Sequence, residues 1–126
     1  MKKTKMLKKN YEFKYVLSKG KYYSGKYIEA FIIKQNKQEN IKFLGIAVSV
    51  KTAKAVKRNR IKRLIRENYN LLENSTKSGY SIVFLWKKNA NSKEAKFELI
   101  QKDMKKIFDK ACMLEEKIWK NYFFGS

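Results

Sequence analysis

The four arginines of this chain are the residues with the most specific chemistry, and all of them lie between positions 58 and 66. They fall in the run Val56-Lys57-Arg58-Asn59-Arg60-Ile61-Lys62-Arg63-Leu64-Ile65-Arg66-Glu67, whereas the other 27 basic residues are all lysine. A planar guanidinium binds phosphate through two parallel hydrogen bonds and stacks on bases, while a lysine ammonium acts as a point charge. The segment therefore predicts a site that recognises phosphate groups.

The spacing of this segment divides it into two helical faces. The predicted apolar face contains Ile61, Leu64, Ile65, Asn68, Leu71 and Leu72. The opposite face carries Asn59, Arg60, Lys62, Arg63 and Arg66, and Arg58 lies at its edge. Like charges at such spacings repel one another, so a polyanion would convert this cost into attraction. An ordinary solvated basic face is the alternative, but the confinement of arginine and the net charge of +20 favour nucleic acid.

The composition excludes several kinds of active site. The chain has no histidine and a single cysteine, Cys112, which argues against Ser/His and Cys/His catalysis, an intramolecular disulfide and a zinc site. The eleven acidic residues form no DxD or ExxH pattern. We therefore expect no self-sufficient catalytic centre and no metal or cofactor held by the protein, and we expect Cys112 to be buried or half-buried.

Length and hydropathy predict one domain with one hydrophobic core. No apolar run approaches the roughly 18 residues of a membrane span, and no signal-peptide core follows the basic N-terminus. We therefore expect a soluble, cytoplasmic protein.

The periodicity of the remaining chain predicts a mixture of helices and strands. In chain order we expect a basic arm over 1–9, a helix over 11–19 between Asn10 and Gly20, strands over 27–33 and 41–50, the arginine-rich helix over 53–73, a strand over 80–86, and a last helix capped by Asn91 or Ser92. The order α-β-β-(β)-α-β-α predicts an α+β fold, a small sandwich with one sheet.

Small residues alternate with large ones in the second of these strands. Leu44, Ile46 and Val48 would face the core, which leaves Gly45, Ala47 and Ser49 on the other face. Those small side chains would form a flat floor for a ligand. Phe13 and either Tyr27 or Phe31 could form its walls, as in grooves that hold single-stranded nucleic acid. The alternative is that these aromatic residues belong only to the core.

The run from Lys54 to Glu67 resembles the RNR signature of the bacterial ribonuclease P protein subunit family. Segments 7–20, 44–49 and 79–84 agree with that family, and the resemblance spans about residues 5–112. It implies a small α/β sandwich similar to the second domain of a ribosomal protein, with a left-handed β-α-β crossover against the usual right-handed rule. It also implies one domain over 1–112 and a C-terminal extension over 113–126, expected to be helical, with Trp119, Tyr122, Phe123 and Phe124.

The resemblance further implies a division of labour with RNA. In this family a large RNA subunit performs the metal-dependent endonucleolytic cleavage that removes the 5′ leader of precursor tRNA, so Mg2+ is expected to act through that subunit, and the protein binds the leader. Matched by position, the residues expected to bind RNA are Arg58, Asn59, Arg60, Lys62, Arg63 and Arg66. Those assigned to the leader cleft are Phe13, Leu17, Phe31 and Lys87. Leu17 replaces an aromatic residue of many members, and Ala53 replaces a common glycine.

Two other functions agree with the same composition. A structural or ribosomal-type RNA-binding protein would share the charge and the absence of histidine, although it would more often carry its basic residues in extended tails. A stand-alone nuclease would have to cut precursor tRNA without any RNA cofactor.

Overall fold

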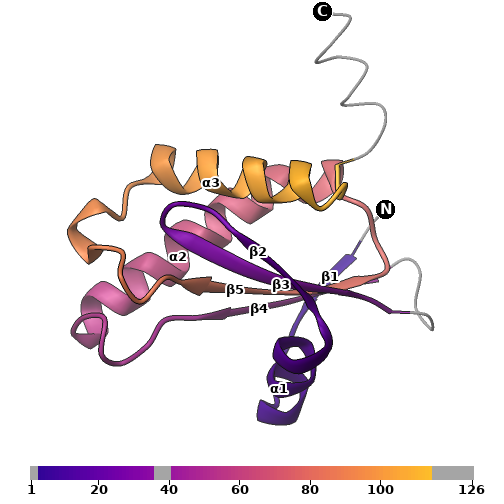
Figure 1. Cartoon of the computed structure of the whole chain (residues 1–126), viewed down its shortest axis with the longest axis horizontal. Coiled ribbons are helices and arrows are strands. Elements are labelled where there is room, and N and C mark those ends of the chain that lie inside the picture. The colour runs from indigo at the N-terminus through magenta and orange to yellow at the C-terminus, as the bar shows by residue number, and fades with distance from the viewer. Residues whose placement is uncertain (1–2, 36–40, 115–126) are drawn as a thin grey trace, which may run out of the picture.

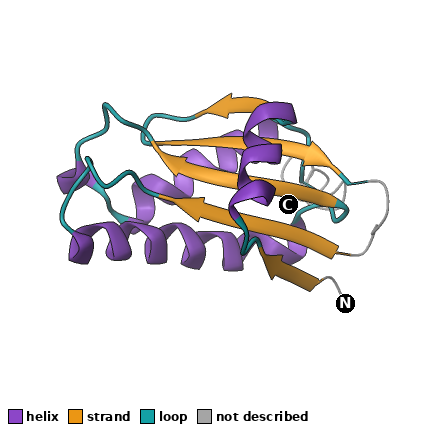
Figure 2. Cartoon of the chain, turned by 90° about the horizontal axis from the view of Figure 1, so that it is seen from below, coloured by secondary structure: helices purple, strands orange, loops and turns teal. Residues whose placement is uncertain are grey.

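A computed structural model describes residues 3–35 and 41–114, and a five-stranded sheet forms its middle layer (Figure 1). The elements in chain order are β1 (Lys3–Met6), α1 (Asn10–Lys19), β2 (Lys21–Ser24), β3 (Ile28–Lys34), β4 (Ile41–Ala47), α2 (Ala55–Leu72), the 3-10 turn η1 (Glu73–Ser75), β5 (Tyr80–Trp86), the 3-10 turn η2 (Ser92–Glu94) and α3 (Phe97–Lys110). Helices α2 and α3 cover one face of the sheet, and α1 lies on the other (Figure 1). Seen from the side of α1, that helix crosses in front of the strands (Figure 2).

The sheet is mixed, with the strand order β1-β4-β5-β3-β2. Strand β4 pairs in parallel with β1 and β5, whereas β3 pairs antiparallel with β5 and β2. The central strand β5 is covered on both faces, which explains its nearly continuous apolar sequence. The predicted α+β class is confirmed, and α2 connects the parallel strands β4 and β5 as a crossover. The left-handed sense of this crossover stays an expectation from the family resemblance.

The main core lies between the sheet and helices α2 and α3. Its fully buried side chains include Ile28, Leu44, Ile61, Ile65, Tyr69, Ile82, Phe84, Ile100, Met104, Ile107 and Phe108. On α2 the buried face differs from the predicted one at two positions, because Tyr69 is buried and Leu71 is 61% exposed. A smaller cluster under α1 consists of Leu7, Val16 and Val83, with half-buried side chains around it. As predicted, Leu44 faces the main core and Gly45 faces α1.

The predicted basic arm over 1–9 was wrong for residues 3–6, which form the edge strand β1. Lys3 to Met6 pair in register with Ile41 to Leu44. The Thr4 hydroxyl lies 2.9 Å from the Tyr69 hydroxyl and donates a hydrogen bond to Glu73 Oε1, also at 2.9 Å. Four residues with two lysines carry no strand signal of their own, so tertiary pairing decides this element.

The last helix begins later than Asn91 and Ser92 suggested. The Asn91 side chain accepts a hydrogen bond from the Lys93 amide at 2.9 Å, but it caps η2, and α3 starts at Phe97. The prediction that Cys112 is buried was also wrong, because this residue is exposed and has a φ of 55°. It occupies the left-handed position that ends α3, where the Met113 amide donates to the Phe108 carbonyl and Met113 is buried.

The predicted end of α1 at Gly20 is confirmed, since the Gly20 amide donates to the Val16 carbonyl at 2.7 Å. At its start the Glu12 carboxylate accepts from the amides of Lys8 and Lys9. In the predicted extension over 113–126, residues 115–126 with their four aromatic side chains lie outside the described residues, and Leu114 forms a bridge to Thr76.

Candidate nucleic-acid interface

The arginine-rich segment forms α2, and its buried side chains fix which residues face outward. Ile61 and Ile65 pack in the core together with Asn68 and Tyr69. The outward face carries six of the predicted RNA-binding residues: Asn59, Arg60, Arg63 and Arg66 are exposed, and Arg58 and Lys62 are half-buried. The structure therefore brings these residues together on one helix.

Two of the arginines also make hydrogen bonds within the protein. Arg58 Nη1 donates to the Ala53 carbonyl at 2.7 Å, which fixes the loop before α2. Arg60 Nη1 donates to the Ala95 carbonyl at 2.9 Å, which ties α2 to the segment before α3. Each guanidinium has five N–H donors, so further donors remain for a ligand. At positions 58 and 60 arginine thus has a structural role in addition to the RNA-binding role predicted for it.

Arg63 and Arg66 differ from these two. Both are exposed, and neither makes a hydrogen bond or an ion pair with another residue in the described part of the chain. Their whole donor sets therefore face solvent. They are the arginines of α2 whose chemistry is most available to phosphate.

A second surface lies on the opposite face of the sheet, beside α1. Phe13 packs over Gly45, at which an added Cβ atom would lie 2.7 Å from the phenyl ring. Phe31 is half-buried, belongs to the same small cluster as Phe13, and lies 5.1 Å from the Tyr22 ring between centroids. Leu17 is 36% exposed on α1. Phe13 and Phe31 are therefore half-buried aromatic residues of the smaller cluster, and Phe13 covers part of the predicted flat floor.

Lys87 follows β5 and is half-buried. Its ammonium donates to Ser24 Oγ at 2.9 Å and to the Gly25 carbonyl at 3.1 Å. It therefore holds the turn between β2 and β3, and one of its three donors remains.

Two carboxylates near these surfaces already accept hydrogen bonds from other groups of the protein. Tyr22 donates a hydrogen bond to Glu29 Oε2 at 2.6 Å, and this bond raises the pKa of Tyr22. The buried Asp103 of α3 accepts from the backbone amides of Lys26, Tyr27 and Ile28 at 3.0, 2.5 and 3.1 Å. Both carboxylates therefore serve as hydrogen-bond acceptors within the fold.

Candidate metal ligands do not converge in residues 3–35 and 41–114, where no group of three or more His, Cys, Asp or Glu side chains could hold an ion. Over the same residues, no helix combines the length and the apolar character that crossing a membrane requires.

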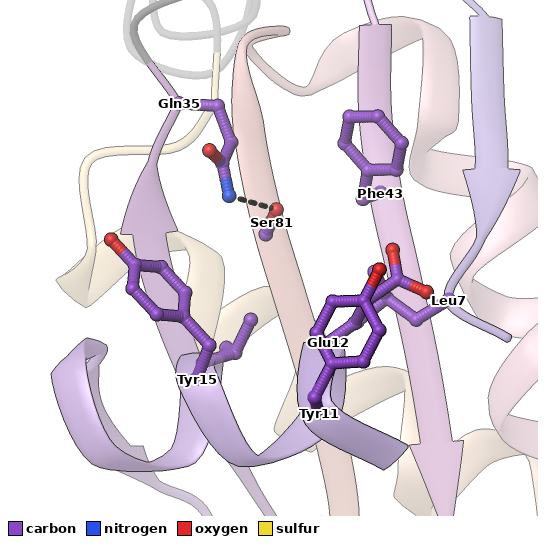
Figure 3. Close-up of a pocket in the computed structure, with 8 residues that line it drawn as sticks. Leu7, Tyr11, Glu12, Tyr15, Gln35, Phe43 and Ser81 are labelled. Carbon is purple, nitrogen blue, oxygen red and sulfur yellow. Dashed lines mark hydrogen bonds between the residues drawn. The ribbon is translucent and has the colours of Figure 1, made fainter. Parts of the chain in front are cut away.

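The structure also contains a pocket that the sequence did not predict. It has a volume of about 520 Å3 and lies between α1 and the sheet (Figure 3). Its lining consists of Leu7, Tyr11, Glu12, Tyr15, Val16, Gln35, Phe43 and Ser81. The available signal was the pair of tyrosines on α1, four residues apart and outside the apolar stripe of that helix.

Comparison with known proteins gives a consistent result. The sequence pattern of the family described as Ribonuclease P matches residues 1–112. The chain is 43% identical over 95 residues to the ribonuclease P protein component of Clostridium botulinum, covering 75% of this chain and 84% of the relative. It is 42% identical over 106 residues to that of Clostridioides difficile, covering 83% and 90%.

Solved structures agree in fold. The RNase P protein of Staphylococcus aureus superposes with a TM-score of 0.76 at 25% identity, covering 87% of this chain and 97% of that one. The protein of Thermotoga maritima superposes with a TM-score of 0.73 at 24% identity, covering 84% and 96%.

Proposed function

The chain belongs to the ribonuclease P protein family, whose general role is in tRNA processing, and we propose that it binds the RNA subunit of the enzyme and the 5′ leader of precursor tRNA. In this proposal α2 contacts the RNA subunit through its six outward residues. The surface beside α1, with Phe13 and Phe31, receives the leader.

The observation that carries this proposal is the placement of the two surfaces on opposite faces of one sheet. Helices α2 and α1 lie on opposite sides of the strands (Figure 1), and Phe13 and Phe31 belong to the cluster under α1. A protein of this size with both surfaces can contact two RNA segments at once. One surface offers guanidinium groups that suit phosphate, and the other offers half-buried aromatic rings on which unstacked bases could stack.

The chemistry of the cleavage itself belongs to the RNA subunit in this proposal. Mg2+ bound through that RNA would supply the activated water and stabilise the developing charge. The protein would orient the substrate: phosphate contacts fix its register, and stacking holds the leader in an extended form. The net charge of +20 also favours assembly with a polyanion.

The test is cleavage of precursor tRNA by the chain alone, by the matching RNA subunit alone, and by the two together at low Mg2+. We expect cleavage at the 5′ end of mature tRNA to be fastest with both components and absent with the chain alone. Cleavage by the chain alone would instead identify a stand-alone nuclease. If the chain leaves the rate of the RNA subunit unchanged and copurifies with ribosomal RNA, it is a structural RNA-binding protein.

A further inference from the structure

We propose that the pocket between α1 and the sheet binds one unstacked nucleobase of an RNA, at a site separate from the leader cleft. The proposal rests on the proposed function only for the source of that base. The pocket itself is argued from its geometry.

The pocket and the proposed leader cleft occupy different rows of the same sheet face. Phe13 covers the row in which Phe31, Val83 and Gly45 are paired across β3, β5 and β4. Ser81 and Phe43, which line the pocket, are paired in the row two residues away along the strands. Two residues of strand span roughly 6.6 Å. Leu7, Val16 and Phe43 contribute both to the pocket and to the cluster around Phe13. The polar and tyrosine side chains of the pocket, such as Tyr15, Gln35 and Ser81, do not belong to that cluster.

The pocket offers aromatic surface that the fold does not use. Tyr11 is 66% exposed and Tyr15 is 51% exposed, and both project from α1 to the side of Phe43 and Ser81 (Figure 3). Neither ring belongs to the clusters of the core. An exposed tyrosine ring is a stacking platform for any base, because every base has an aromatic face.

The floor of the pocket carries a fixed polar group. Gln35 Nε2 donates to the hydroxyl of Ser81 at 2.7 Å, and Ser81 is 1% exposed in an otherwise apolar strand. The backbone amide of Gln35 donates to the Gly79 carbonyl at 2.7 Å, which holds the residue in place. The side-chain amide retains an acceptor oxygen and one N–H donor. An adjacent donor and acceptor match the hydrogen-bonding edge of a base.

The charges around the pocket suit a base that carries a phosphate. The Lys9 ammonium lies 5.7 Å from the centroid of the Tyr11 ring, which lines the pocket. The Glu12 carboxylate that lines the pocket accepts from the amides of Lys8 and Lys9, so its charge is partly compensated. Leu7, Val16 and Phe43 form apolar walls. A volume of about 520 Å3 lies within the range of ligand pockets.

The first test uses the full chain and two small probes, AMP and ribose 5-phosphate, followed by nuclear magnetic resonance. Both probes carry the same phosphate, so only the difference between them reports on the base. We expect AMP to shift the side-chain amide of Gln35 and the backbone amide of Ser81, and ribose 5-phosphate to leave both unchanged. Equal shifts with the two probes, or AMP shifts confined to residues around Phe13, would overturn the proposal.

A matched pair of substitutions at exposed tyrosines locates the site. Tyr15→Leu removes one exposed ring and should weaken AMP binding at Gln35 and Ser81 at least fivefold. Tyr22→Leu makes the same change on β2, at a ring that is 49% exposed and does not line the pocket, and should leave that binding unchanged. The opposite pattern would place the base beside Tyr22 and overturn the proposal. Because Tyr15 is exposed, its replacement leaves the fold intact, which the spectrum itself verifies.

The source of the base is then identified by measuring RNA binding with the reconstituted ribonucleoprotein that carries Tyr15→Leu. Weaker assembly with the RNA subunit would assign the base to that subunit, and weaker binding of precursor tRNA by the assembled enzyme would assign it to the substrate. If neither changes while AMP still binds the unsubstituted chain, the site takes a free nucleotide and the RNA assignment is wrong. A selective loss of affinity for precursor tRNA in Phe13→Leu tests the proposed function separately. The proposed function and the nucleobase site can therefore fail independently.

Discussion

Phe13 lies so close to Gly45 that a Cβ atom at position 45 would stand 2.7 Å from Cε1 and 2.8 Å from Cζ of the phenyl ring. Such distances are well inside van der Waals contact. The missing side chain at position 45 is therefore what allows α1 to approach β4. Gly45 was predicted to form part of a floor for a ligand, and in the structure it allows α1 to pack closely on β4.

Gly45→Ala tests this relationship. We expect the added methyl group to displace Phe13 and α1 and to lower the free energy of unfolding by about 1–2 kcal/mol, measured by urea denaturation. Combining it with Phe13→Leu, which shortens the opposing side chain, should cost less than the sum of the two single changes. Strict additivity would show that the ring and the glycine are not coupled.

Arg60→Lys separates the two roles of the arginine that donates to the Ala95 carbonyl. The substitution keeps the charge and loses the planar fork, so assembly with the RNA subunit should weaken by about 1–2 kcal/mol in a filter-binding titration. Arg63→Lys is the matched control for the stability of the free protein, because Arg63 is exposed and makes no bond within the described protein.

The two variants differ in what they do to the free protein. Arg60→Lys should also lower the free energy of unfolding by about 1 kcal/mol, since one hydrogen bond is lost, whereas Arg63→Lys should leave it unchanged. Lys8→Arg, at an exposed position outside α2, should alter neither quantity. Equal assembly by Arg60→Lys and the unsubstituted chain would show that charge alone matters there.

Asp103→Asn should be strongly destabilising, although nothing in the sequence distinguishes this acid from the others. The carboxylate accepts from three backbone amides in the turn between β2 and β3. An asparagine has one acceptor oxygen and turns an N–H group toward those donors. We expect a loss of about 2–3 kcal/mol in urea denaturation at pH 7. Asp109→Asn, an exposed change on the same helix, should cost little; comparable losses would remove the special role of Asp103.

Tyr69 should make stability fall at high pH. Burial raises the pKa of Tyr69 to about 12, the charge of Glu73 adds to that effect, and the hydrogen bond with Thr4 opposes it. The ordinary pKa of tyrosine is 10.0, so in the unfolded chain the phenol ionises first. Stability linked to this group is complete below pH 10 and is lost as the pH rises toward 12.

Unfolding in urea at pH 9 and pH 11 measures this effect, with Tyr69→Phe as the reference because the other tyrosines also titrate. The unsubstituted chain should lose roughly 1 kcal/mol more than Tyr69→Phe over that interval. Identical losses would mean that Tyr69 ionises as easily in the folded protein as in the unfolded one.

The sequence predicted best the elements whose pattern depends only on local periodicity. Strand β5 was predicted at its observed bounds, and α2 differs by two residues at its start and one at its end, because long apolar or amphipathic runs allow few alternatives. Strand β1 and the late start of α3 depend on tertiary pairing and on a capped 3-10 turn. The short β1 has no strand signal of its own, and the cap at Asn91 could not show that it begins a 3-10 turn rather than α3.

The candidate site shows the same division. Confinement of arginine identified α2 as the basic face, but it could not reveal that Arg60 bonds to Ala95, 35 positions along the chain. The pocket beside α1 joins Gln35 and Ser81, 46 positions apart, with two tyrosines. Contacts between residues so far apart in the sequence are determined by the tertiary fold, and the local spacing of residues does not reveal them.

Phe13→Leu tests whether the surface beside α1 recognises the leader. Leucine keeps most of the apolar volume and removes the aromatic face, so precursor tRNA should bind the reconstituted enzyme more weakly by at most about 1–3 kcal/mol. Mature tRNA, which has no leader, should bind equally well to both proteins. Raised salt should weaken precursor binding in both, because the phosphate contacts and their counterion release remain.

The control for this variant is its own stability, since Phe13 also packs over Gly45 and against the cluster of Leu7, Val16 and Val83. Circular dichroism at the assay temperature must show a folded protein before the affinities are compared. A folded variant that loses affinity only for the precursor supports a stacking contact between Phe13 and the leader. Equal losses for both tRNAs, or a melted variant with no selective loss, would leave Phe13 as a core residue alone.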